Sequence, residues 1–174
     1  MTTTVKLTLT GGLGLWGAFS VRTLLYAAIV LTFACEGPPT PAQSVLPRGH
    51  VIFPDGTKVA VDIAATDPAR MRGLMFRQSL AEHEGMIFVF PKVGFYPFWM
   101  KNTLIPLDML WLDPDGRVVS IAQSVPPCKT DPCPEYPPRA DALYVVELTS
   151  GFAGRHALKT GDRLVLQGVP QRGS

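Results

Sequence analysis

Polar residues interrupt one long apolar stretch of the sequence, FWMKNTLIPLDMLWLD, which spans residues 98–113. Lys101 can pair with a carboxylate or phosphate, and the amide of Asn102 can both donate and accept hydrogen bonds. Trp99 offers an aromatic face on which a ligand can stack. In an extended strand, residues 99 and 101 point to the same side because side chains alternate. The stretch therefore predicts a binding surface for a small polar ligand, centred on Trp99, Lys101 and Asn102 and supported by Asp108.

The same polar residues also have a structural interpretation. Asn102 and Thr103 can cap the turn that follows them. Asp108 can accept hydrogen bonds from backbone N–H groups or pair with Lys101 inside the protein, where the loss of one partner costs about 3–5 kcal/mol. If Asp108 and Lys101 instead converge on open space, they would form the centre of a hydrolase-like enzyme acting on envelope glycans or another small polar substrate. No GxSxG, HExxH or phosphate-loop motif is present, so we favour a binding module over an enzyme.

Potential metal ligands are dispersed along the chain. Soft thioether sulfur suits copper(I), but no MxxM, HxxxH or CxxC spacing brings methionines, histidines or cysteines together. Methionine also fills irregular cores, and we favour this interpretation for Met71, Met75, Met86, Met100 and Met109. The sequence therefore predicts no metal site and no cofactor.

Two cysteines, Cys128 and Cys133, lie in the proline-rich stretch PPCKTDPCPEYPP. A disulfide between them would close a short loop and stabilise the fold by about 2 kcal/mol on the chain-entropy model. Metal binding by the two thiols is the alternative, but no further ligand lies close in sequence. Disulfides persist in oxidising compartments outside the cytosol, so the disulfide interpretation fits a chain that is exported.

The N-terminal segment has the pattern of an export signal. Arg22 is followed by the apolar run TLLYAAIVLTFA and then by Cys35. The run is too short to span a bilayer core, which needs about 20 residues. We predict a signal segment over residues 1–34, and we treat a true start near Val21 as a further hypothesis. The protein would then be periplasmic or anchored on the extracytoplasmic side of the membrane.

Cys35 is the expected point of lipid attachment. The sequence LTFAC places a small residue directly before the cysteine, as bacterial lipoprotein signals do, although Phe33 is bulkier than is usual in them. Simple cleavage near Ala34 or Ala42 is the alternative. A lipid on Cys35 would attach the domain to the membrane through a proline-rich tether, residues 35–47.

The charge balance argues against a nucleic-acid partner. The chain has 16 basic and 14 acidic residues, and two of the basic residues, Lys6 and Arg22, precede Cys35. The remainder therefore carries no net charge, whereas nucleic-acid-binding proteins normally carry a basic face. The expected partner is a small polar ligand or a component of the cell envelope.

Most of the remaining sequence predicts short strands. Apolar and polar residues alternate over residues 58–63, and DGT and DPDG predict hairpin turns. One short helix is expected between Thr66 and Gly73, and another within GFAGRHALKTGD. The prediction is a mainly β, compact barrel- or sandwich-like domain of about seven short strands with two short helices. It covers residues 48–168 and leaves residues 169–174 as a tail.

Several motifs follow one another along this domain: RMRGLMFRQSL, EGMIFVF, FWMKNTLIPLDMLWLD, the proline-rich cysteine loop, YVVEL and GDRLVL. In this order they resemble the domain-of-unknown-function family 192 over nearly the whole domain. The resemblance implies a small, mostly β fold that is often exported or lipid-anchored in bacteria, and it implies no established reaction. It also places Arg72, Arg77 and Thr103 among the candidate site residues, with Arg77 able to meet a carboxylate, phosphate or sugar hydroxyl of the ligand.

Overall fold

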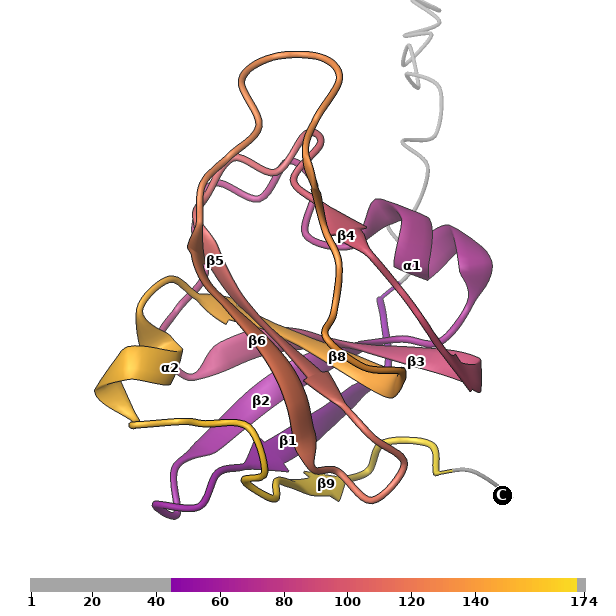
Figure 1. Cartoon of the computed structure of the whole chain (residues 1–174), viewed down its shortest axis with the longest axis vertical. Helices are drawn as coiled ribbons and strands as arrows, with labels where there is room; N and C mark the ends of the chain where they lie inside the picture. Colours follow the sequence, from indigo (N-terminus) through magenta and orange to yellow (C-terminus); the bar gives the residue numbers. More distant parts are fainter. Residues whose placement is uncertain (1–44, 172–174) are drawn as a thin grey trace, which may run out of the picture. The chain divides into compact units, whose positions relative to one another are not determined.

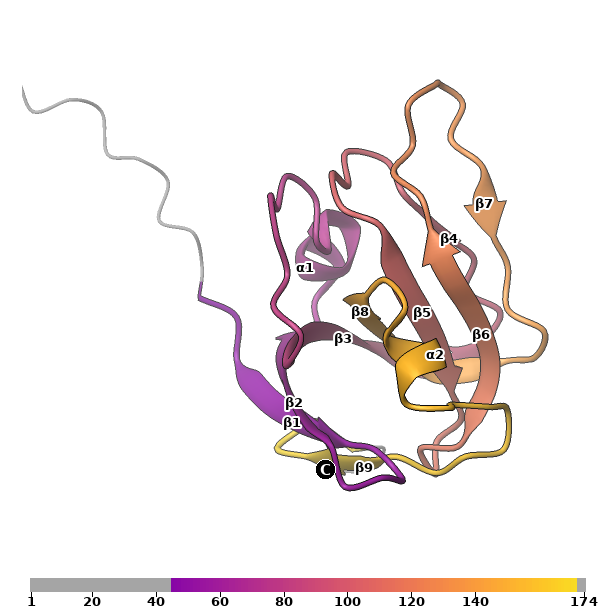
Figure 2. The same ribbon diagram turned by 90° about the vertical axis from the view of Figure 1, so that its left-hand side faces the viewer.

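A mixed sheet of seven strands, in the order β6-β5-β8-β3-β2-β1-β9, is the framework of the computed structural model, which describes residues 45–171 (Figure 1). The strands of this sheet are β1 (Arg48–Ile52), β2 (Lys58–Ala64), β3 (Glu84–Gly94), β5 (Leu107–Leu112), β6 (Val118–Val125), β8 (Ala142–Thr149) and β9 (Val165–Gln167). The remaining elements are the strand pair β4 (Phe98–Trp99) and β7 (Glu135–Tyr136) and the helices α1 (Asp67–Arg72) and α2 (Phe152–Arg155). Helix α1 and the β4–β7 pair lie toward one end of the sheet and β9 toward the other (Figure 1, Figure 2).

The prediction of a mainly β domain with two short helices is confirmed. Residues 45–171 form nine strands where about seven were predicted, and the two-residue β7 falls inside the proline-rich cysteine loop, where alternation gave no strand signal. Residues from the two edges of the sheet meet at one place: Val118 N donates to Asp162 O at 2.8 Å, and Leu164 N donates to Gly116 O at 2.9 Å. These bonds do not extend into a ladder between β6 and β9, so the sheet is not a closed barrel, and a sandwich-like arrangement is consistent with it.

Helix α1 lies in the connection between β2 and β3, the one parallel pair of neighbours among the described strands. Parallel neighbours need a crossover connection rather than a hairpin. Thr66 caps the helix, since its Oγ1 accepts a hydrogen bond from Ala69 N at 3.4 Å, and the helix ends at Gly73, whose φ is 48°. The predicted helix is confirmed, and α1 packs against the interior strand β2, beside a cleft.

Both faces of strand β8 are buried. Its side chains contribute to two apolar clusters, with Val146 and Leu148 in one and Val145 in the other. Glu147 is the exception to this apolar pattern, and only 5% of its surface is exposed. An acidic residue on an interior strand is unusual.

The predicted disulfide is confirmed. Cys128 and Cys133 are bonded, with their Cα atoms 5.7 Å apart, in the loop between β6 and β7. The predicted signal segment, the lipidation of Cys35 and the start near Val21 lie outside the described residues, as does the end of the predicted tail. Within residues 45–171, no helix is long and apolar enough to cross a membrane.

Candidate functional site

An open cleft of about 910 Å³ lies between α1 with the turn that follows it, the strand β3, and β4 with the turn that follows it. Its walls are largely aromatic and aliphatic, including Phe88 and Phe90 of β3 and Phe98 of β4. Trp99, Lys101 and Asn102, which the sequence predicted to form a binding surface, all line this cleft. The cleft is more apolar than the predicted surface for a small polar ligand. The sequence alone did not show which aromatic residues would lie beside Trp99, Lys101 and Asn102.

Exposed apolar side chains surround the cleft. Met71 is 76% exposed, Phe76 is 61% exposed and Trp99 is 48% exposed, and all three line it. Large apolar residues exposed together on one surface often mark a binding site. Core packing, predicted for the methionines, is correct for Met86, Met100 and Met109 but wrong for Met71. The helix α1 is too short and too peripheral to bury its outer face.

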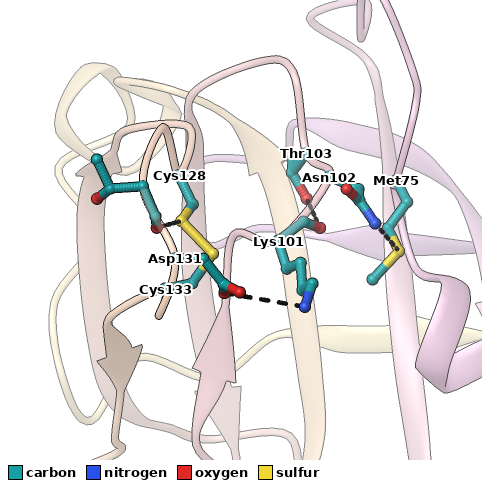
Figure 3. Close-up of a disulfide and its surroundings, with 8 residues drawn as sticks. Met75, Lys101, Asn102, Thr103, Cys128, Asp131 and Cys133 are labelled. Carbon is teal, nitrogen blue, oxygen red and sulfur yellow. Dashed lines mark hydrogen bonds and ion pairs between the residues drawn. A yellow bond between two sulfur atoms is a disulfide. The ribbon is translucent and has the colours of Figure 1, made fainter.

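Lys101 lies beside the Trp99 ring, with Nζ 5.7 Å from the ring centroid. Its ammonium is also 3.9 Å from Asp131 Oδ1, in the loop closed by the disulfide (Figure 3). Both partners of this ion pair are exposed, at 44% and 80% of their side-chain surface, so the pair is weak and Lys101 remains available at the mouth of the cleft.

The predicted strand through Trp99–Asn102 is wrong, because β4 ends at Trp99 and the chain then turns. Met100 is fully buried in the apolar core, and Thr103 N donates to Met100 O at 3.2 Å across the turn. The predicted division of side chains holds nevertheless, since Met100 points inward while Trp99 and Lys101 line the cleft. The burial of Met100 in the core, rather than the alternation of a strand, places Trp99 and Lys101 on the other side.

Two residues beside the cleft adopt left-handed backbone conformations, Phe76 with φ 64° and Asn102 with φ 57°. Their backbones are joined, since Phe76 N donates to Asn102 O at 2.8 Å. The Asn102 side chain donates to Met75 Sδ at 3.8 Å (Figure 3). Asparagine tolerates this conformation, whereas a bulky residue such as phenylalanine rarely adopts it. The fold therefore holds an exposed phenylalanine at the cleft in an unfavourable backbone conformation, a feature typical of functional sites.

Arg77 lies in a neighbouring cavity of about 620 Å³ rather than in the cleft. Its guanidinium donates to Asp62 Oδ2, and Arg48 donates to Asp62 Oδ1 at 2.8 Å. Burial alone would raise the pKa of Asp62, but the hydrogen bonds from the two arginines outweigh it and hold this pKa below its usual value. Arg77 therefore pairs with a carboxylate beside the cleft rather than lining it, and its contact with a ligand stays a prediction.

Asp108 does not support the cleft either. It is fully buried on β5 and accepts backbone hydrogen bonds from Ser124 N at 2.7 Å, Gly151 N at 3.0 Å and Ala153 N at 2.8 Å. These bonds join β5 to β6 and to the start of α2. Lys101 pairs with a different carboxylate, that of Asp131. The two side chains therefore do not converge on open space, and the alternative of a hydrolase-like centre made by Asp108 and Lys101 is wrong. The structural interpretation of Asp108 is the correct one.

Glu147 is the residue of this site that sequence reasoning missed. It lines the cleft from β8, and its Oε2 is buried without a hydrogen-bond partner among the described residues. Burial raises the pKa of Glu147 to about 8, and the charge of Arg77 only partly opposes this effect. A signal was present, since the motif YVVEL places one carboxylate in an otherwise apolar strand.

The described residues contain no group of three or more His, Cys, Asp or Glu side chains suited to holding a metal. The site consists of one apolar cleft, lined by the exposed cation–aromatic pair of Lys101 and Trp99 and by the buried carboxyl group of Glu147. Such an arrangement can hold the apolar part of a ligand and contact polar groups at two separate places.

The chain is similar to one protein family and to two solved structures. A model of a protein family described as "Uncharacterized ACR" matches residues 50–166. A crystal structure from Sinorhizobium meliloti, of a protein whose name proposes a transcription regulator, is 33% identical with a TM-score of 0.60, covering 68% of this chain and 92% of its own. A protein of unknown function from Novosphingobium aromaticivorans is 32% identical with a TM-score of 0.62, covering 75% of this chain and 94% of its own. None of the curated proteins matches.

Proposed function

We propose a function for this chain, which belongs to the domain-of-unknown-function family 192, from its cleft, since the family brings no established reaction with it. The protein is a binding module for an amphiphilic ligand, one with an apolar body and a polar end. The apolar body lies against the aromatic and methionine side chains of the cleft. The polar end meets Lys101 and Asn102 beside Trp99.

The observation that carries this proposal is the exposure of Met71, Phe76 and Trp99 around one open cleft. Exposed apolar surface is unfavourable in water, and covering it contributes roughly 25 cal/mol for each Å² removed from solvent. Methionine adapts its shape to different apolar partners. The tryptophan and the neighbouring ammonium supply one stacking contact and one positive charge.

We further propose that the protein acts outside the cytoplasm, attached to the membrane through a lipid on Cys35. The apolar segment before Cys35 and the proline-rich tether after it support this location. The disulfide between Cys128 and Cys133 supports it as well, because such bonds persist in oxidising compartments. A ligand from the cell envelope, where amphiphiles are abundant, fits both the location and the cleft.

A dye with an apolar aromatic body and one negative charge, anilinonaphthalene sulfonate, tests the proposal. We expect it to bind with a stoichiometry of one and to quench the fluorescence of Trp99. Phe76→Ala should weaken this binding, whereas Phe95→Ala, which removes another exposed phenylalanine that does not line the cleft, should leave it unchanged. Equal binding by both variants would refute the assignment of the cleft.

A further inference from the structure

Glu147 lines the cleft and carries a buried oxygen that no described residue pairs with. The residue is 5% exposed, lines the cleft and has a buried Oε2 with no hydrogen-bond partner among the described residues. Native proteins pair nearly all of their buried polar atoms, because an unpaired one forfeits the hydrogen bonds it makes in water. A ligand atom that enters the cleft can restore the missing bond.

The surroundings of Glu147 favour its uncharged form. Its cross-strand neighbours are Met86 on β3 and Met109 on β5, neither of which carries a charge. The cation that acts on it is Arg77, which is already hydrogen-bonded to Asp62. Burial raises the pKa of Glu147 to about 8, so near neutral pH the carboxyl group keeps its proton and can donate a hydrogen bond.

The charges at the cleft act against a positively charged partner for Glu147. Arg72 is exposed and Lys101 is half-exposed, and both line the cleft. An ammonium group entering past them would meet two like charges before reaching a carboxyl group that is mostly protonated. An uncharged oxygen atom meets neither obstacle.

We infer that the ligand of the cleft carries an uncharged oxygen acceptor, a carbonyl or hydroxyl, in its apolar part, and that the protonated carboxyl group of Glu147 donates a hydrogen bond to it. This inference rests on the proposed function and specifies the chemical class of the ligand. Glu147 is the specificity-determining residue, since the apolar walls alone would accept a hydrocarbon equally well.

Matched ten-carbon probes test the inference on the full chain: 2-decanone with a carbonyl, 1-decene with no polar group, and decylamine with a positive charge. We expect 2-decanone to bind about tenfold more tightly than 1-decene, the ratio that one hydrogen bond supplies. Glu147→Met should reduce this ratio to near one. Glu147→Gln, whose amide still donates, should preserve most of it.

The dependence on pH gives a second readout. In the wild-type protein, the preference for 2-decanone should fall as the pH rises above about 8, the value of the Glu147 pKa, because the ionised carboxylate cannot donate. The Glu147→Gln variant should keep its preference across the same range. A merely structural role of Glu147 would not produce this difference.

Each other outcome overturns the inference in a distinct way. Tightest binding of decylamine, lost in Glu147→Gln, would show that Glu147 acts as a carboxylate counter-ion. Equal binding of 2-decanone and 1-decene, unaffected by either variant, would show that Glu147 does not contact the ligand, and the proposed apolar binding function would stand. Failure of all three probes to bind would overturn both.

Discussion

Replacing Phe76 distinguishes the contribution of its ring to binding from the effect of its backbone conformation on stability. Its φ is 64°, a conformation that costs a residue with a side chain about 1–2 kcal/mol relative to glycine. Alanine and glycine both remove the ring, but alanine keeps the unfavourable conformation and glycine relieves it. Phe76→Ala and Phe76→Gly therefore form a matched pair.

The expected changes in the free energy of unfolding follow from the exposure and the backbone conformation of Phe76. The residue is 61% exposed, so roughly two fifths of a phenylalanine surface of about 200 Å² is buried against the protein. Either variant loses this buried contact, which costs about 2 kcal/mol of folding stability. Glycine recovers about 1–2 kcal/mol of backbone strain and loses about 0.5–1 kcal/mol to its greater freedom in the unfolded chain. We expect Phe76→Gly to be more stable than Phe76→Ala by about 0.5–1 kcal/mol.

Urea denaturation measures the free energies of unfolding, and dye titration measures binding. Both variants should bind the dye more weakly than the wild-type protein, although they differ in stability. If Phe76→Ala is at least as stable as Phe76→Gly, the backbone at residue 76 is not strained and that part of the reasoning is refuted. If both bind the dye as the wild-type protein does, Phe76 has no part in the cleft.

Three further predictions concern the interior and the loop. Replacing Cys128 and Cys133 together by serine should lower the free energy of unfolding by about 2 kcal/mol in urea denaturation, because the loop is no longer closed in the unfolded chain. Asp108→Asn should lower the melting temperature markedly, since three backbone N–H groups lose their charged acceptor, and an unchanged value would contradict the role given to Asp108. The pKa of Glu147 is raised to about 8 from an ordinary value of 4.5, so its contribution to stability is fully present below pH 4.5 and is lost as the pH rises toward 8, where only the unfolded chain is readily ionised. Glu147→Gln should therefore gain stability relative to the wild-type protein across that range in denaturation experiments at several pH values, and a difference independent of pH would show that the carboxyl group is not buried as described.

The sequence predicted those elements whose signals are local. Thr66 and Gly73 mark the ends of α1, because capping depends on residues within one turn. The close spacing of Cys128 and Cys133 predicted their disulfide for the same reason. Local patterns of this kind also gave the mainly β class of the fold.

The sequence could not predict the site in full, since its parts meet through the tertiary structure. Trp99 and Lys101 were recognised, but their apolar neighbours come from α1 and β3, separate elements that only the tertiary structure brings to them. Asp108 and Glu147 are both acidic residues in apolar strands, and the sequence alone does not distinguish them. The structure gives Asp108 three backbone donors, whereas one oxygen of Glu147 has no donor or acceptor within residues 45–171.

The position of Glu147 on β8 has a consequence for how binding can be detected. Strand β8 is hydrogen-bonded on one side to β5 and on the other to β3, so a ligand that contacts Glu147 touches the interior of the sheet rather than a peripheral loop. Its binding energy opposes any opening that separates these three strands. Amide protons of β3, β5 and β8 should therefore exchange with deuterium more slowly when the cleft is filled, and their protection would report occupancy even for a ligand that has no colour or fluorescence of its own.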